Sequence, residues 1–151
     1  MNQTVNDNRT KNSFETKVKP AILRPAELPA VDRGKGNKTI PLVSGAVGSK
    51  QMLTGITEIA PGQAIGLHTH NCEESVIVIE GQAMAELDGV DYPLDTFDTT
   101  WLPADVPHRF KNPSQERKLR IFWTYASPDA TRTMAATGET HSIGSEHAKV
   151  R

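Results

Sequence analysis

The sequence predicts an all-β protein, a sandwich or a barrel built from short strands. Its 151 residues fit one domain. Ten prolines and eleven glycines interrupt the chain too often for long helices. Between Thr39 and Tyr125, apolar and β-branched runs recur roughly every 8 to 12 residues, and none of them has the 3.6-residue apolar period of a helix.

Turn signals separate the expected strands. Pro61-Gly62 ends the first long strand, and Asp88-Gly89 is a two-residue hairpin turn between two later ones. The run SVIVI is apolar on both faces, so it is buried on both sides or covered by a partner. After a start near Thr39, the expected strands cover residues 51–60, 75–79, 82–87, 90–94, 97–102, 108–112 and 118–125.

Polar segments flank the barrel, which we assign to residues 21–126. Residues 1–20 are rich in Asn, Thr and Lys, which is typical of a disordered arm; an arm that pairs with a partner subunit is the alternative. Residues 127–151 form a second polar tail, whose helical or loop state the sequence leaves open. Its hydroxyl-rich part could fold over the mouth of the barrel.

Composition argues against several partners. The formal net charge is −1 and no basic stripe is present, so we expect no nucleic-acid partner. No run approaches the roughly 20 apolar residues of a membrane span, and the N-terminal MNQTVNDNRT lacks the apolar stretch of a secretory signal. Cys72 is the only cysteine, so no intrachain disulfide forms. We therefore expect a cytoplasmic protein.

Three of the five histidines fall in segments with strand and turn signals. His68 and His70 are one residue apart, so on a strand both imidazoles leave the same face. Glu74 follows a short turn, and an antiparallel return brings its carboxylate beside them. His108 can complete the group from a later strand. Such ligands suit a first-row divalent ion. The spacing alone does not distinguish a metal site from ordinary polar side chains that bind no metal.

The segment GQAIGLHTHNCEESVIVIEG resembles the first motif of the cupin superfamily, G-x5-H-x-H-x3-E-x6-G. Every fixed position is present, at Gly62, His68, His70, Glu74 and Gly81.

A later segment, FDTTWLPADVPHRFKN, is similar to the second cupin motif, G-x5-P-x-G-x2-H-x3-N. Pro103, His108 and Asn112 match, while Phe97 and Asp105 stand where glycine is usual. Aspartate adopts the left-handed conformation less readily than glycine, which questions the tightness of that turn.

The resemblance to small single-domain cupins covers residues 40–125. It implies a double-stranded β-helix, a jelly-roll barrel with one divalent transition metal in its mouth. The implied ligands are His68, His70, Glu74 and His108. Fe²⁺, Mn²⁺, Ni²⁺, Co²⁺, Cu²⁺ and Zn²⁺ all accept such ligands. Cupins often pair through their sheets, so the resemblance favours a homodimer.

Strand alternation predicts neighbours of the site. If His108 points inward, so does Phe110, and Val76 and Val78 follow Glu74 on the inner face. The more apolar face of the last strand adds two aromatic residues. With Met84, the pocket candidates are therefore Phe110, Val76, Val78, Met84, Trp123 and Tyr125, for which ordinary core packing is the alternative. No catalytic residue is assigned, because the motifs contain no second carboxylate that presents itself as a base.

The expected function is a metal-dependent enzyme acting on a small metabolite with a carbonyl, carboxylate or diol group. Isomerase or lyase chemistry and dioxygenase chemistry both remain open, because the fold does not determine the reaction. The alternative is a non-catalytic module that binds or senses a small molecule. The small size and the absence of an identified base favour that alternative.

Overall fold

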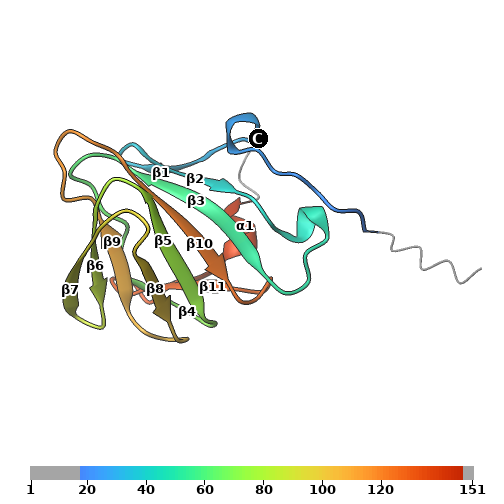
Figure 1. Ribbon diagram of the computed structural model, residues 1–151. Helices are drawn as coiled ribbons and strands as arrows, with labels where there is room; N and C mark the ends of the chain where they lie inside the picture. The colour runs from blue at the N-terminus through green and yellow to red at the C-terminus, as the bar shows by residue number, and fades with distance from the viewer. Residues whose placement is uncertain (1–17, 148–151) are drawn as a thin grey trace, which may run out of the picture.

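Two antiparallel sheets of six strands each form the protein, for which a computed structural model describes residues 18–147 (Figure 1). In spatial order, the first sheet contains β1 (Val31–Gly34), β2 (Asn37–Pro41), β3 (Leu53–Ile59), β10 (Leu119–Tyr125), β5 (Glu74–Glu80) and β8 (Thr99–Leu102). The second sheet contains β12 (Thr140–Ser142), β11 (Thr131–Met134), β4 (His68–His70), β9 (His108–Lys111), β6 (Ala83–Leu87) and β7 (Val90–Leu94). The predicted all-β architecture is confirmed.

Helices are short in the described part of the chain. They are two 3-10 turns, Pro25–Glu27 and Gly45–Val47, and the C-terminal helix α1, Ile143–His147. None of the helices between residues 18 and 147 has the length and apolar character needed to cross a membrane.

The core lies between the sheets and follows from strand alternation. On β10, four alternate side chains are buried: Leu119, Ile121, Trp123 and Tyr125. Val76 and Val78 of β5 are buried in the same way, as the sequence predicts, whereas Ile77 and Ile79 on its other face are half-buried. Apolar side chains with a period of two therefore direct the strands of both sheets toward one core.

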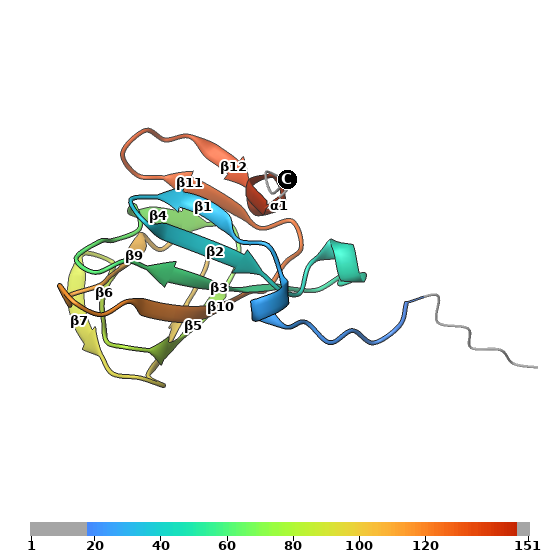
Figure 2. The same ribbon diagram turned by 90° about the horizontal axis from the view of Figure 1, so that it is seen from above.

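The terminal segments extend the sheets. Most of the arm predicted for residues 1–20 lies outside the described residues, as do residues 148–151 of the tail. Within the range set apart as a polar tail, β11 pairs with β4, and β12 pairs with β11. Figure 2 shows β11, β12 and α1 on the same side of the barrel as β1. The tail is thus placed beside the strand that carries His68 and His70.

The two departures from the second cupin motif keep the backbone conformation of glycine. Phe97 has a φ of 75° and Asp105 a φ of 67°. The Phe97 N–H donates to the carbonyl of Val78, and the Asp105 N–H donates to the carbonyl of His70 at 2.8 Å. The turns therefore stay tight, and residues with a side chain adopt the left-handed region in both.

Phe97→Gly is expected to raise the free energy of unfolding by about 0.5–1 kcal/mol. A left-handed conformation costs a residue with a side chain about 1–2 kcal/mol, and glycine loses about 0.5–1 kcal/mol more in entropy on folding. Phe97 is 74% exposed, so little burial is lost. Urea denaturation measures the change. Phe97→Ala keeps the Cβ atom and should gain nothing; equal stabilities of the two variants would contradict backbone strain at this position.

Candidate metal centre

Strands from both sheets bring four potential ligands together. His68 and His70 project from the same face of β4, and His68 is paired in register with His108 of β9. Glu74 begins β5 in the opposite sheet. One ligand atom from each of the four side chains lies within 4.8 Å of the others, and all four residues are buried. The predicted ligands therefore converge on one point.

Backbone carbonyls fix the orientation of the three imidazoles. The Nδ1 atoms of His68, His70 and His108 lie 2.6, 2.8 and 2.8 Å from carbonyl oxygens, which belong to Gly66, Thr131 and Val106. A carbonyl only accepts, so Nδ1 carries the proton in each ring. In the neutral imidazole, the lone pair of Nε2 is then free and points into the cluster. Carbonyls hold metal-binding histidines in this way in other proteins.

With these tautomers, the cluster lacks the N–H donors that its acceptor atoms need for hydrogen bonds. Nε2 of His68 lies 3.1 Å from Nε2 of His70. Oε2 of Glu74 lies 2.7 Å from Nε2 of His70 and 3.3 Å from Nε2 of His108. Each of these contacts joins two acceptors unless an imidazole gains a second proton. Glu74 Oε2 and His108 Nε2 are buried and accept no hydrogen bond from the described residues.

A divalent cation among the four atoms would satisfy them all, because nitrogen and oxygen ligands bind such ions at about 2.0–2.2 Å. The residues present therefore fit a metal ion.

The electrostatics of the cluster favour the protonation states that a metal needs. Burial raises the pKa of Glu74, but hydrogen bonds and positive charge from His108 and His70 in their imidazolium form outweigh it and lower this pKa to about 2. A metal ion bound by the neutral imidazoles would supply positive charge beside Glu74 in their place. Burial, with the positive charge of Arg132 nearby, lowers the pKa of His68 well below its ordinary value. The cluster thus offers a carboxylate and a neutral imidazole at neutral pH, the forms that bind metals.

A small cavity adjoins the cluster. Its volume is about 20 Å³, room for about one water molecule. Its lining includes His68 and Glu74 together with three of the six predicted pocket residues, Phe110, Trp123 and Tyr125. The other three do not line it: Val76 and Val78 are core residues, and Met84 lies on the opposite face of β6 from the buried Ala83 and Ala85. Burial raises the pKa of Tyr125, so its phenol stays protonated.

Known proteins share this fold. The family model described as "Cupin domain" matches residues 55–125. The chain is similar to "Polyketide synthase CurC" from Streptomyces cyaneus, with 32% identity over 108 residues that cover 70% of each protein. The chain belongs to the cupin superfamily.

Further relatives of this cupin have diverse names. "Auxin-binding protein 1" from Arabidopsis thaliana is 27% identical over 108 residues, which cover 64% of this chain and 54% of the relative. The polyketide cyclase RemF from Streptomyces resistomycificus has the same fold, with a TM-score of 0.67, 15% identity, and coverage of 83% of this chain and 86% of that one. A cupin from Shewanella frigidimarina has a TM-score of 0.62 and 21% identity, and the match covers 73% and 92% of the two chains. The jelly-roll barrel expected from the motifs is confirmed.

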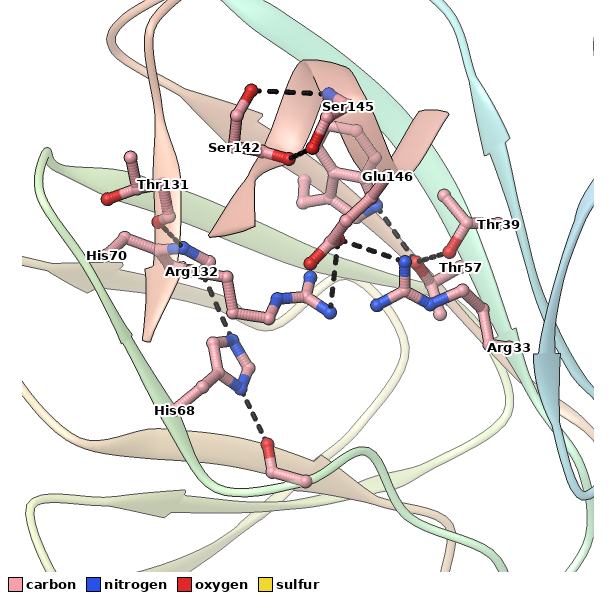
Figure 3. Close-up of polar contacts among 12 residues, drawn as sticks. Arg33, Thr39, Thr57, His68, His70, Thr131, Arg132, Ser142, Ser145 and Glu146 are labelled. Carbon is pink, nitrogen blue, oxygen red and sulfur yellow. Dashed lines mark hydrogen bonds and ion pairs between the residues drawn. The ribbon is translucent and has the colours of Figure 1, made fainter. Parts of the chain in front are cut away.

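The cupin carries three charged residues at this site that the sequence analysis missed. Arg33 and Arg132 line the cavity, and the carboxylate of Glu146 lies between their guanidinium groups (Figure 3). Arg132 belongs to β11, whose four residues are all half-buried and show no apolar alternation. The signal in the sequence is therefore no more than an arginine within a Thr-Arg-Thr run. Its position depends on the pairing of β11 with β4, which local patterns do not encode.

The C-terminal helix α1 closes this side of the cupin barrel. Ile143 is fully buried, and its N–H donates to the carbonyl of Ala130 at 2.9 Å. At the other end of α1, the ring of His147 stacks on Trp123 with centroids 5.5 Å apart. Trp123 also lines the cavity, so α1 lies against its wall.

Acidification is expected to loosen α1. Burial lowers the pKa of His147 to about 4; the charges of Arg33 and Arg132 act in the same direction, and that of Glu146 opposes it. Because the unfolded value is about 6.5, the stabilisation by neutral His147 is complete above that pH and is lost as the pH falls toward 4. Hydrogen exchange of residues 140–147 at pH 7 and pH 5 measures the effect. His147→Phe keeps an aromatic ring that cannot titrate; the same pH dependence in both proteins would contradict this role of His147.

Proposed function

We propose that this cupin is a metal-dependent enzyme that moves a proton on a small, oxygen-rich metabolite, in an isomerase or lyase type of reaction. The observation that carries the proposal is the convergence of three oriented Nε2 lone pairs and one carboxylate on a buried point. A role as an inert scaffold would not need such a set of unsatisfied ligands. The similarity to a relative named polyketide synthase supports chemistry on carbonyl compounds.

His68, His70, Glu74 and His108 would hold the metal. A divalent ion bound there would supply Lewis acidity toward a carbonyl or carboxylate oxygen. Around the metal site, the protonated phenol of Tyr125 and the guanidinium of Arg132 line the cavity as hydrogen-bond donors. These donors favour an oxygen substituent that gains negative charge when a neighbouring C–H proton passes to a base. Water or buffer would be that base, because the only carboxylate that lines the described cavity, Glu74, is in the ligand cluster. Phe110 and Trp123 supply apolar walls that limit the access of water.

The test follows proton exchange and oxygen use together. Metal-loaded protein in D₂O is incubated with a panel of hydroxyketones, diketones and keto acids, and deuterium incorporation is followed by NMR. We expect exchange at carbon next to a carbonyl, without oxygen consumption, and no exchange with His108→Ala. Substrate-dependent oxygen uptake would instead identify a dioxygenase and would contradict the proton-transfer reaction.

The second candidate function is non-catalytic binding or sensing of a small molecule. Glu74 is the only carboxylate among the residues that line the described cavity, and it is committed to the ligand cluster. The carboxylate of Glu146 is paired with Arg33 and Arg132, so no free carboxylate is placed there as a base. Relatives named auxin-binding proteins support this candidate. Saturable binding of a panel compound, with neither exchange nor turnover, would favour it over an enzyme.

A further inference from the structure

The chain places one of its own carboxylates between two arginines at the cavity. Oε2 of Glu146 lies 3.0 Å from Nη1 of Arg33 and 3.7 Å from Nη1 of Arg132 (Figure 3). Glu146 comes from α1, whereas the arginines come from β1 and β11. One carboxylate is therefore the shared counter-ion of two guanidinium groups.

Arg132 faces the metal centre. It is paired in register with His70, so its side chain leaves the same face of the sheet as that imidazole. With His68 and Glu74, it lines the small cavity. The guanidinium of Arg132 has a buried Nε–H without a partner among the described residues and shares its counter-ion with Arg33. This arrangement favours the binding of a further anionic acceptor.

Arg33 and Glu146 stand between this cavity and the surface. Arg33 lines the inner cavity and also an outer pocket of about 290 Å³, which Glu146 and His141 line as well. The side chains of Arg33 and Glu146 are 20% and 13% exposed, so the ion pair is partly open to solvent. A small molecule in the outer pocket would meet this ion pair before it met His68 or Glu74.

We propose that Arg33 and Arg132 form a binding site for the carboxylate of the substrate, and that Glu146 occupies this site until the substrate displaces it. Calling the ligand a substrate rests on the proposed function, whereas carboxylate binding by the two arginines does not. The substrate class is then a small carboxylic acid whose second oxygen group reaches the metal centre after Glu146 has left, because the inner cavity alone has room for about one water molecule. Glu146 is an intramolecular competitor that covers the two cations in the absence of this acid.

The charges support an anionic ligand. Two arginines and a divalent ion would carry four positive charges, against three carboxylates, those of Glu74, Glu146 and, at the outer pocket, Asp32. Displacing Glu146 into solvent leaves the centre more positive still, and an incoming carboxylate restores the balance. Arginine suits this role because its planar fork matches a carboxylate with two parallel hydrogen bonds. The displaced segment is short, since α1 has only five residues.

The test uses propionate, which reproduces the glutamate side chain, with neutral propionamide as a comparison. Full-length protein, metal-loaded and chelator-treated, is titrated with each compound and followed by NMR chemical shifts. Glu146→Ala should bind propionate about tenfold more tightly than wild type, because the internal competitor is gone. Propionamide should not show this gain. Glu116→Ala is the matched control, since Glu116 is exposed, lies outside both pockets and forms no ion pair within residues 18–147; it should bind as wild type does.

Removing either arginine should abolish the gain. Glu146→Ala combined with Arg132→Gln, or with Arg33→Gln at the more exposed position if the first does not fold, should bind propionate at least tenfold more weakly than Glu146→Ala alone. Equal affinity of wild type and Glu146→Ala, or a gain that survives both arginine changes, would overturn the proposal. The chelator-treated samples distinguish the arginine site from the metal centre. Propionate binding in these samples supports the arginine site even if the protein binds no metal. Metal binding without propionate binding overturns the arginine site and supports the metal centre alone.

Discussion

Chelation is expected to lower the thermal unfolding midpoint of the metal-loaded protein by roughly 10 °C. The ligand atoms of the centre are buried, and they converge only in the folded chain. A ligand that binds only the native state at 1,000 times its Kd stabilises it by about 4 kcal/mol. In a protein of this size, each kcal/mol shifts the midpoint by about 2–4 °C. Differential scanning calorimetry with and without chelator measures the difference.

His108→Ala provides the control for this experiment. The variant lacks one of the four ligands, so its midpoint should be low and should not respond to the chelator. His141→Ala removes an exposed histidine outside the cluster and should respond as wild type does. If the wild-type midpoint were insensitive to both chelator and added metal, the centre would not couple metal binding to folding.

Gly55→Ala is expected to destabilise the protein by about 2–4 kcal/mol, through overpacking and the loss of one buried hydrogen bond. Gly55 of β3 lies opposite Trp123 of β10 in register. A Cβ atom at Gly55 would overlap Cζ2 of Trp123 and approach the carbonyl oxygen of Ile40 to 2.9 Å. The indole would have to move, although its Nε1–H donates to Oγ1 of Thr57 at 2.9 Å. Urea denaturation measures the loss.

Gly45→Ala is the matched control for this substitution. A Cβ atom at Gly45 would meet nothing within 4 Å, so the variant should keep or slightly increase the wild-type stability. In Gly55→Ala, the fluorescence of Trp123 should also shift as its surroundings change. Wild-type stability of Gly55→Ala would show that the barrel accommodates the methyl group without displacing the indole.

The sequence predicts most of the barrel because its strands follow local rules. Alternation places Leu119, Ile121, Trp123 and Tyr125 on one face of β10, and the structure buries all four. The same rule places His68 and His70 together, and the cupin motifs add Glu74 and His108. These four positions depend on short spacings and on a family pattern, so the sequence is sufficient to predict that they converge.

The sequence does not predict the C-terminal wall of the site. Residues 131–134 alternate neither in hydropathy nor in burial. The backbone of Thr131 forms hydrogen bonds with the side chains of His70 and Asn71, some sixty positions earlier in the chain. The pairing of β11 with β4 provides the carbonyl of Thr131 that holds His70, and it places Arg132 in the cavity. Glu146 then follows from the docking of α1. Long-range polar contacts of this kind leave no periodic signal in the sequence.

The central claim is that the four converging side chains bind one metal ion, and the metal content of the purified full-length protein tests it most directly. Mass spectrometry of the elements should find about one first-row divalent transition metal per wild-type chain, and little or none in folded His68→Ala and His108→Ala. Thermal unfolding of the same samples establishes that the variants are folded. Metal-free wild type that takes up no ion on incubation with each candidate metal, or variants that retain the full metal content, would contradict the claim.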